Sequence, residues 1–444
     1  MKGLPSISLY QVFRNRKRIL NNPLPFHNEN FQKYGDSFRV KVRSGGPVIF
    51  TRNPCLIKHL LQKNHKSYHK SPLQTVDLAK YIGHGILTSN GDHWLTHRRM
   101  VQPAFHRKKL MALISAMEVA IKGELLKIKS DTTIDVFPLM GDLAFQVVAK
   151  TLFSRNDIQA DMATLKEITN SNQEMLIREM RQPYLKWWFR LSGQIRKHIG
   201  QSDEARVLLN KIIADRVNSG EKRDDLLDML LSARYEDGAT MSREQLLDEV
   251  MILFTAGYET TANALSFTLY FLAKHPLEQQ KAFEEISKVL TQGETDITAI
   301  SNLRYVSSCI EEAMRLYPPA YYIDRIAIED DEFEGRNIAK GTMFLMSIYE
   351  IHRYDTFWKQ PKDFIPERFA TISKKELSDY YYPFGAGPRM CVGNNFAMYE
   401  MILTVSFLLQ KYHISTQMNT VSINPMISLK PQKVALKFTA RPAR

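Results

Sequence analysis

The sequence predicts a mainly α-helical protein with small β-sheets, and three observations support this fold class. Hydrophobic residues make up 44% and charged residues 24% of the 444 residues, which is the composition of a globular chain. Apolar residues recur at helical spacing in nearly every segment from residue 91 to 317. Strand-like alternation is limited to short segments, without internal repeats or low-complexity linkers. The sequence therefore predicts one domain over residues 1–444, with β-containing parts at 30–65, 320–348 and 414–444 and helical parts at 91–317 and 394–412.

The first predicted elements are a β-hairpin and a short helix. Apolar and polar residues alternate in 35–42 and 46–52, around a glycine turn at 44–46. Asn53 then predicts a helix start, because its side chain can accept a hydrogen bond from the first turn. Pro54 suits the first helical position, where a missing N–H costs nothing.

The longest predicted helix begins after Ser242 and ends before Pro276. Ser242 with Gln245 three residues later is typical of a capping box, and proline cannot continue a helix. The middle of this helix is apolar on all sides, which indicates a helix buried in the core. Gly257 in its middle is unfavourable by about 1 kcal/mol relative to alanine, so we expect a close neighbour at its backbone.

The charge balance favours an acidic partner. Lys and Arg number 60 and Asp and Glu 47, for a net charge of +13. The basic residues are scattered and no nucleic-acid-binding motif occurs, so a transient acidic protein partner is expected rather than nucleic acid. Three cysteines are too few for a secreted disulfide scaffold. Without a signal peptide or a run of about 18 apolar residues, we expect a soluble, cytoplasmic protein with no membrane partner.

The most informative segment is residues 384–393, FGAGPRMCVG, which contains Cys391. Glycines on both sides allow backbone N–H groups to turn toward the sulfur, and the following helix directs its positive end nearby. Both features favour a thiolate, which can act as a nucleophile or a metal ligand. The alternative is a small buried cysteine in a glycine turn.

These ten residues resemble the haem-binding loop of the cytochrome P450 family, Phe-x-x-Gly-x-Arg-x-Cys-x-Gly, at every fixed position. Three further matches follow in the order of the family. Trp94 and Arg98 resemble its Trp-x-x-x-Arg motif, residues 256–261 its oxygen-groove motif, and Glu312 with Arg315 its Glu-x-x-Arg motif. The resemblance runs from about residue 30 to the C-terminus. It implies the cytochrome P450 fold of the soluble bacterial type, with a long central helix through the core.

The resemblance implies haem b as the cofactor, with Cys391 as its axial metal ligand. Trp94 and Arg98 lie one helical turn apart, so an indole N–H and a guanidinium can serve a buried anion such as a haem propionate. The alternative for Arg98 is a solvated basic helix face. The residues implied to bind the cofactor are Trp94, Arg98, Ala256, Gly257, Arg325, Phe384, Arg389, Cys391 and Gly393.

Glu312 and Arg315 can pair across one helical turn, which alone would be a weak surface salt bridge. The resemblance adds Arg368 and implies a buried network that holds the segment leading to Cys391. The role of these three residues is structural.

Glu259 and Thr260 are the predicted catalytic residues. The resemblance implies that this acid and alcohol relay protons during dioxygen activation. The alternative is a surface glutamate beside a threonine that hydrogen-bonds its own preceding turn.

The predicted activity is that of a haem-thiolate monooxygenase, which inserts one atom of dioxygen into a C–H bond. Since one fold uses the whole chain, electrons from NAD(P)H must arrive through a redox partner. A small acidic ferredoxin with its reductase fits the net charge, and a flavodoxin is the alternative. We expect a monomer that docks this partner through His97, Arg98, Arg99, Arg107, Lys108 and Lys109.

The substrate prediction depends on residues 320–324. Two phenols and a carboxylate near the haem edge would favour a small, oxygen-rich substrate such as a methoxylated sugar, which would be hydroxylated or O-demethylated. Trp187 and Trp188 would roof this pocket, which Phe254, Tyr321, Tyr322 and Asp324 would line. Core packing of these side chains is the alternative. A fatty-acid or terpenoid hydroxylase and a non-catalytic haem gas sensor or carrier are the other functions that the sequence leaves open.

Overall fold

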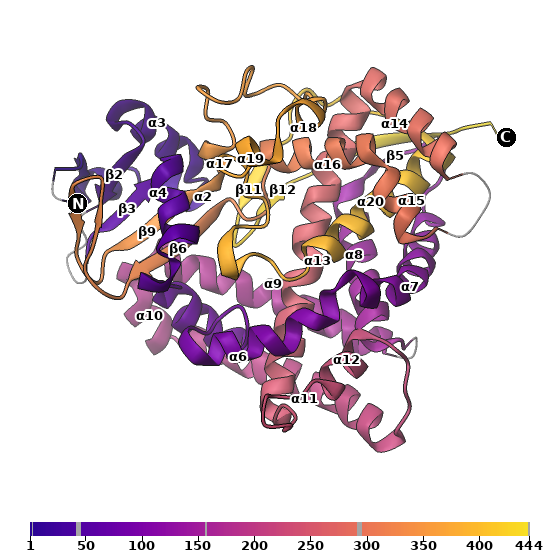
Figure 1. Cartoon of the computed structure of the whole chain (residues 1–444), viewed down its shortest axis with the longest axis horizontal. Helices are drawn as coiled ribbons and strands as arrows, with labels where there is room; N and C mark the ends of the chain where they lie inside the picture. The colour runs from indigo at the N-terminus through magenta and orange to yellow at the C-terminus, as the bar shows by residue number, and fades with distance from the viewer. Residues whose placement is uncertain (2, 41–45, 156–157, 291–294, 443–444) are drawn as a thin grey trace. The chain divides into compact units, whose positions relative to one another are not determined.

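The computed structural model describes residues 1, 3–40, 46–155, 158–290 and 295–442. Its contacts group the chain into two compact units. Unit 1 comprises Met1–Pro72, Glu311–Cys391 and Ser422–Gln432, and unit 2 comprises Leu73–Ile310, Val392–Val421 and Lys433–Arg444. The predicted fold class is confirmed, since each unit joins helices with small sheets (Figure 1). One domain over residues 1–444 stays a prediction.

Unit 1 is built on a six-stranded sheet in the order β1-β2-β3-β9-β6-β4. Its strands are β1 (Ser6–Ile7), β2 (Ser37–Val40), β3 (Val48–Thr51), β4 (Tyr68–His69), β6 (Tyr322–Ala327) and β9 (Met343–Ser347). Two hairpins accompany it, β7 (Asp331–Phe333) with β8 (Arg336–Ile338), and β11 (Ile423–Pro425) with β12 (Leu429–Pro431). Strands distant in sequence meet in this sheet, since β3 runs parallel to β9.

The predicted hairpin near residue 40 is confirmed in its strands. β2 and β3 pair antiparallel with Ser37 opposite Thr51; the predicted turn at 44–46 lies in part outside the described residues. The helix start at Asn53 is also confirmed, because its side chain accepts a hydrogen bond of 2.8 Å from the Leu56 N–H. The helices of unit 1 are α1 (Leu9–Arg14), α2 (Arg16–Asn21), α3 (Leu24–Tyr34), α4 (Pro54–Lys58), α17 (Ile348–Ile351), α18 (Arg368–Thr371) and α19 (Lys374–Leu377).

Unit 2 is mainly helical. Its helices are α5 (Ala79–Ile82), α6 (Gly91–Val101), α7 (Arg107–Leu125), α8 (Val136–Phe153), α9 (Gln159–Arg181), α10 (Lys186–Leu191), α11 (Gln194–Ser219), α12 (Leu226–Ser232), α13 (Arg243–Lys274), α14 (Pro276–Val289), α15 (Ile297–Asn302) and α20 (Asn394–Lys411). A three-stranded sheet joins β5 (Thr133–Asp135), β13 (Ala435–Ala440) and β10 (Tyr412–Ser415). Helix α16 (Arg304–Leu316) runs from unit 2 into unit 1.

Helix α13 confirms the longest predicted helix and packs along α8 (Figure 1). The Ser242 side chain accepts a hydrogen bond of 3.1 Å from the Gln245 N–H. The predicted capping box is nevertheless only half formed. The Gln245 amide instead donates to the His84 carbonyl at 3.0 Å and to Glu249 at 3.1 Å, because a tertiary partner competes with the helix end.

Among the described residues, one helix is long and apolar enough to cross a membrane. This helix is α8, with a mean hydropathy of 1.4, and 61% of it is buried inside the structure. A core helix meets the same criterion, and α8 packs against both α7 and α13. We therefore describe α8 as a core helix.

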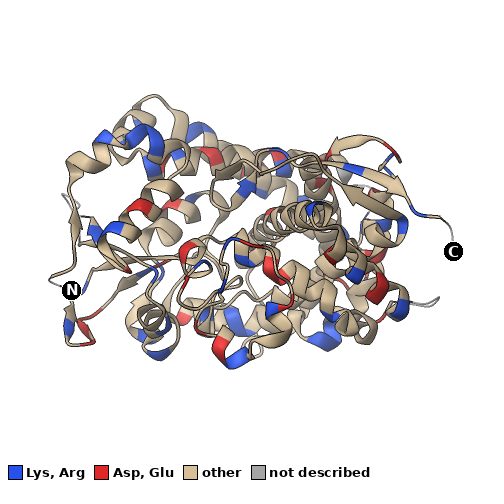
Figure 2. Cartoon of the chain, turned by 90° about the horizontal axis from the view of Figure 1, so that it is seen from above, with Lys and Arg blue, Asp and Glu red and all other residues tan. Residues whose placement is uncertain are grey.

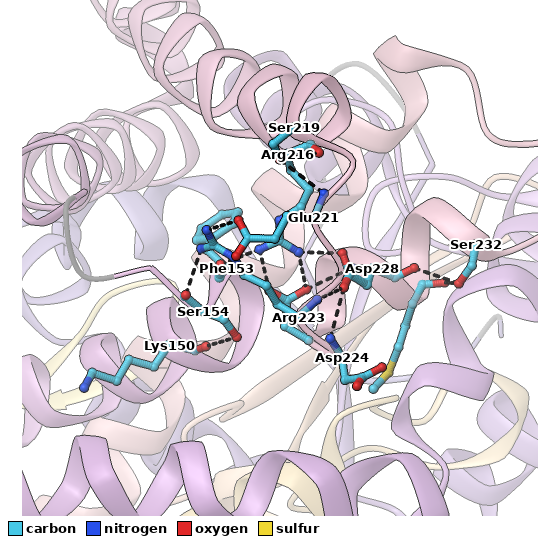
Figure 3. A network of polar contacts seen from close by, with 12 residues as sticks. Lys150, Phe153, Ser154, Arg216, Ser219, Glu221, Arg223, Asp224, Asp228 and Ser232 are labelled. Carbon is cyan, nitrogen blue, oxygen red and sulfur yellow. Dashed lines mark hydrogen bonds and ion pairs between the residues drawn. The ribbon is translucent and has the colours of Figure 1, made fainter.

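A buried arginine joins three helices of unit 2 (Figure 3). From the end of α11, the Arg216 guanidinium donates to the Asp225 carboxylate at 2.7 Å and to the Phe153 carbonyl at 2.6 Å. Asp225 also accepts a hydrogen bond from the Asp228 N–H as the N-cap of α12. The ends of α8, α11 and α12 are thereby held together by one fully partnered charge.

Candidate functional site

The Cys391 loop of unit 1 closes on itself through backbone hydrogen bonds. The Cys391 N–H donates to the Phe384 carbonyl at 2.9 Å, and the Met390 N–H donates to the Gly387 carbonyl at 3.0 Å. The Cys391 residue is exposed. The sequence alternative of a buried structural cysteine is therefore wrong, and the thiol is accessible to a ligand.

Gly387 fixes how closely this loop approaches the preceding part of the chain. Its φ of +70° lies in the left-handed region that favours glycine. A Cβ atom at this position would lie 2.0 Å from the Leu61 carbonyl oxygen, which is impossible without moving backbone. The loop therefore requires glycine for both its conformation and its space.

Two arginines lie close together in the same unit. The Arg389 guanidinium donates to the carbonyls of His65 and Tyr68 at 3.2 and 3.0 Å, and the Arg325 guanidinium donates to the Asp324 carbonyl at 2.7 Å. Burial, with the positive charge of Arg389, lowers the pKa of Arg325 to about 10. A buried and a partly buried positive charge in proximity suit an anionic ligand group.

The Glu312 network expected from the sequence is present. Glu312 and Arg315 form a bidentate pair, and Arg368 donates to the same carboxylate at 3.2 Å. The Glu312 carboxylate also accepts a hydrogen bond of 2.9 Å from the Ile365 N–H. One buried carboxylate thus fixes the segment that precedes the Cys391 loop in the chain.

In unit 2, helix α13 has one accessible stripe. Ala256 is exposed, and Leu253, Gly257 and Thr260 are partly exposed, while nearly all other residues of the middle of this helix are buried. These four residues recur at i, i+3, i+4 and i+7, which places them on one helix face. The sequence predicted a helix buried on all sides, and this is wrong for the stripe. Its stripe of mainly small residues can accept a flat ligand against the backbone.

The close neighbour expected at Gly257 is another helix. A Cβ atom there would lie 3.0 Å from Val148 Cγ2 on α8. The expected close neighbour is therefore present, and close packing of α8 on α13 accounts for this glycine.

Glu259 and Thr260 lie on different sides of α13. Glu259 is buried. Burial raises the pKa of the neighbouring Tyr258 phenol, and the charge of Glu259 raises it further. The partly exposed Thr260 hydroxyl donates to the Ala256 carbonyl at 2.9 Å. This bond to the carbonyl one turn earlier is the alternative that the sequence left open for Thr260. The hydroxyl oxygen retains lone pairs that can accept a hydrogen bond from a proton donor.

The Trp94 and Arg98 pair lies on α6, as predicted. Trp94 is buried, and the partly exposed Arg98 donates from Nε to the Gln102 side chain at 3.0 Å. His97 was expected on a partner-docking surface, and this is wrong. It is buried, 3.5 Å from the Glu249 carboxylate, and burial together with His93 lowers its pKa to about 4.

The residues expected to line a polar substrate pocket have partners of their own. The Tyr321 hydroxyl donates to the Met426 carbonyl at 2.7 Å, and the Tyr322 hydroxyl is hydrogen-bonded to His27 at 2.8 Å. The Asp324 carboxylate accepts from the Ser71 N–H at 3.0 Å. Phe254 is fully buried in unit 2 against Phe145, their ring centroids 5.4 Å apart.

Trp187 and Trp188 were expected to roof the pocket, but they are 60% and 50% exposed. They cannot enclose a substrate in this arrangement. Over the described ranges, moreover, no group of three His, Cys, Asp or Glu side chains is placed to hold a metal ion.

A cytochrome P450 family model matches residues 3–438. The chain belongs to the cytochrome P450 family. It is 29% identical over 423 residues to Cytochrome P450 CYP72A613 of Trigonella foenum-graecum, covering 89% of this chain and 79% of the relative. It is 30% identical to an 11-oxo-beta-amyrin 30-oxidase of Glycyrrhiza uralensis, with coverages of 87% and 76%. It is 33% identical to Cytochrome P450 4A10 of Rattus norvegicus, with coverages of 80% and 74%. The expectation of a soluble bacterial type stays a prediction.

As a cytochrome P450, the protein is a monooxygenase that uses haem bound by a cysteine thiolate and electrons from a redox partner. The residues fit this cofactor. In unit 1 the Cys391 thiol is accessible, and the clustered Arg325 and Arg389 suit a haem propionate. In unit 2 the α13 stripe suits a flat ring.

Sequence reasoning missed the Leu61 carbonyl that confines the Cys391 loop and Leu253 in the accessible stripe. A helical wheel of α13 would not have found Leu253, because apolar residues lie on every face of this part of the helix. Leu61 is more than 300 residues from Gly387 in the chain, so no local signal links them.

Proposed function

We propose that the protein hydroxylates an apolar substrate of the terpenoid or fatty-acid class. The observation that carries this choice is the internal pairing of Tyr321, Tyr322 and Asp324. A polar substrate was expected because these groups would otherwise be buried without partners. Since they have partners within unit 1, the reason for a sugar-like substrate and its O-demethylation disappears. The similarity to an 11-oxo-beta-amyrin 30-oxidase supports the terpenoid class.

Haem b bound through the Cys391 thiolate would supply the oxidising power for C–H hydroxylation. Arg325 and Arg389 in unit 1, and Trp94 and Arg98 in unit 2, would bind its propionates. Phe384 and Gly393 would shape the ends of the cysteine loop. Ala256 and Gly257 would contact the ring along the stripe.

Thr260 and Glu259 would deliver protons during dioxygen activation. The Thr260 hydroxyl is fixed by its bond to the Ala256 carbonyl, so its two lone pairs have defined directions. Glu259 is buried on another side of the helix, so we propose that it passes protons on toward Thr260. Thr260 would then be the residue that donates a proton closest to the reacting oxygen.

For electron supply we propose an acidic ferredoxin and its reductase, with NAD(P)H as the source and a flavodoxin as the alternative. Arg107, Lys108 and Lys109 at the start of α7 are exposed and can meet an acidic surface. Lys and Arg are otherwise spread over many helices (Figure 2). We retain a monomer in the cytoplasm as the proposed state.

The thiolate is tested by the ferrous carbonyl spectrum of the haem-loaded protein. We expect the strongly red-shifted Soret band of thiolate ligation and its loss in Cys391→His. An unshifted band in the wild-type protein contradicts the ligand assignment.

The substrate class is tested by parallel titrations of the ferric protein with terpenoids, medium-chain fatty acids and methylated sugars. We expect a spin-state change with an apolar compound, and a change with methylated sugars alone contradicts the proposal. Turnover of the apolar compound with a surrogate ferredoxin system and NADPH then separates an enzyme from a haem gas sensor.

A further inference from the structure

Thr255 on α13 carries a buried hydroxyl that has no hydrogen-bond partner among the described residues. The residue is 9% exposed, and its Oγ1 atom lies out of reach of solvent. Burying a hydroxyl without a partner is unfavourable, and buried polar groups in folded proteins normally have one. This hydroxyl therefore indicates a partner that binds it in the working protein.

The other Ser and Thr hydroxyls of α13 all bond to the carbonyl one turn earlier. Thr260, Thr261, Ser266 and Thr268 donate to the carbonyls of Ala256, Gly257, Ala262 and Ala264 at 2.9, 3.1, 2.7 and 2.8 Å. The Met251 carbonyl offers Thr255 the same bond, and Thr255 does not form it. Its hydroxyl can therefore serve a group other than its own backbone.

Glu259 is the charged residue of α13 nearest to Thr255 in the chain. It follows Thr255 by one helical turn, so the two side chains lie on one face. Side chains of a helix lean toward its N-terminus, which directs Glu259 over the turn that carries Thr255. Both residues are buried, so bulk water does not compete for the hydroxyl. A carboxylate has about four lone-pair positions and can accept this bond beside others.

The face with Thr255 and Glu259 runs alongside the accessible stripe. Thr255 directly precedes Ala256, and Glu259 directly precedes Thr260, so each pair is separated by about 100° around the helix axis. The side chain of Glu259 must therefore reach around the helix toward Thr260. How it is held decides whether the carboxylate can do so.

We propose that Thr255 is a positioning residue for proton delivery, whose hydroxyl donates a hydrogen bond to the Glu259 carboxylate. This inference rests on the proposed supply of protons by Glu259 to Thr260. A hydrogen bond to an ionised carboxylate is about twice as strong as one between neutral groups, so it can hold a flexible side chain in place. Proton transfer requires hydrogen-bond reach between its two groups, so the position of the carboxylate affects it directly. Thr255 itself transfers no proton.

A double-mutant cycle tests the hydrogen bond without any turnover. Thr255→Val removes the hydroxyl and keeps the branched shape, and Glu259→Met removes the acceptor and keeps a long unbranched side chain. We expect Thr255→Val to lower the urea midpoint of the haem-loaded protein in the wild-type background, because a charge-assisted hydrogen bond is lost. In the Glu259→Met background the same substitution should not lower the midpoint, since no carboxylate is there to bind the hydroxyl.

Thr268 gives the matched control cycle. Its hydroxyl bonds to the Ala264 carbonyl, and it lies about 13 Å from Glu259 along the helix axis. Thr268→Val should therefore lower the midpoint equally in the wild-type and Glu259→Met backgrounds, because effects at distant, independent sites add.

The positioning role is tested by the partition of electrons between product and hydrogen peroxide. We expect Thr255→Val to lower product per NAD(P)H and to raise peroxide, while the carbonyl spectrum and the substrate affinity in spin-state titrations stay as in the wild type. Thr255→Ser keeps the hydroxyl and should restore the yield, and Thr268→Val should leave it unchanged. A structural role alone would move the urea midpoint without moving this partition.

Each contrary outcome overturns the inference. A midpoint that rises on Thr255→Val in both backgrounds shows a hydroxyl without a partner. An equal fall in both backgrounds shows a partner other than Glu259, such as an ordered water or the Met251 carbonyl. A coupled pair whose Thr255→Val variant keeps the wild-type yield has no part in proton delivery. An unchanged yield in Glu259→Gln contradicts the proposed role of Glu259 itself and removes the positioning role with it, while the cycle still reports the bond.

Discussion

Glu312 and Arg315 form a bidentate ion pair in which neither side chain is exposed. The Arg315 Nε and Nη2 atoms lie 2.6 and 2.9 Å from the two carboxylate oxygens. Nη1 of Arg315 donates to the carbonyls of His352 and Pro361 at 2.7 and 2.8 Å. Every polar atom of the pair therefore has a partner, which is the condition under which a buried ion pair is tolerated.

Removing one charge of this pair should destabilise the protein strongly. We expect Glu312→Gln to lower the free energy of unfolding by about 3–5 kcal/mol, because Arg315 and Arg368 remain buried without their counterion. Urea denaturation and the haem content of purified protein measure the effect. The control is Glu29→Gln, which breaks the exposed pair with Arg18 and should leave both values unchanged. Equal behaviour of the two variants would contradict the structural role.

Gly387→Ala should prevent formation of the cysteine loop. Its Cβ atom would meet the Leu61 carbonyl at 2.0 Å, and alanine disfavours the φ of +70°. We expect loss of haem loading, measured by the ratio of Soret to protein absorbance. Gly200→Ala is the matched control, because α11 leaves open space around that position, and it should stabilise the protein by about 0.5–1 kcal/mol. A fully loaded Gly387→Ala protein would show that the loop tolerates a Cβ atom.

Glu311 should make stability depend on pH near neutrality. Burial raises the pKa of this carboxyl to about 7, with Lys374 opposing. Between its ordinary pKa and about 7 the folded state holds a proton that the unfolded state has lost, so stability falls as pH rises. Glu311→Gln should therefore be more stable than the wild type at pH 8, by up to about 3 kcal/mol, and equal to it near pH 4. Urea midpoints at the two pH values test the sign, and a difference confined to the lower pH would contradict it.

Local patterns were predicted well from the sequence, and long-range pairings were not. The cap at Asn53 and the limits of α13 depend on neighbouring residues, and both were predicted correctly. Tyr321 finds its partner 105 residues away at Met426, and Tyr322 finds His27 at a separation of 295. No periodicity encodes such pairings, so the sequence predicts polar groups without partners and, from them, a polar substrate. The exposure of Trp187 is a second example. Phe189 is the residue of α10 that is buried, and this leaves Trp187 on the outer side of the helix.

Thr260→Ala should uncouple electron consumption from product formation. The hydroxyl of Thr260 lies on the accessible stripe of α13, and its loss removes a proton-transfer group there without opening a cavity in the core. We expect the carbonyl spectrum to be unchanged, product per NAD(P)H to fall, and hydrogen peroxide to rise, because electrons are still consumed while proton delivery to the reaction is impaired. Thr260→Ser, which keeps the hydroxyl, should restore most of the yield, and Glu259→Gln should resemble Thr260→Ala.

Thr268 provides the control for this experiment within the same helix. Its hydroxyl donates to the Ala264 carbonyl at 2.8 Å, as that of Thr260 does to Ala256, but Thr268 is fully buried. Thr268→Ala should therefore change the free energy of unfolding and leave the product yield as it is. If both alanine variants kept the wild-type yield, Thr260 would have only the back-bonding role. If both lost it equally, the effect would come from helix packing. Only a loss confined to position 260, rescued by serine, assigns proton delivery to its hydroxyl.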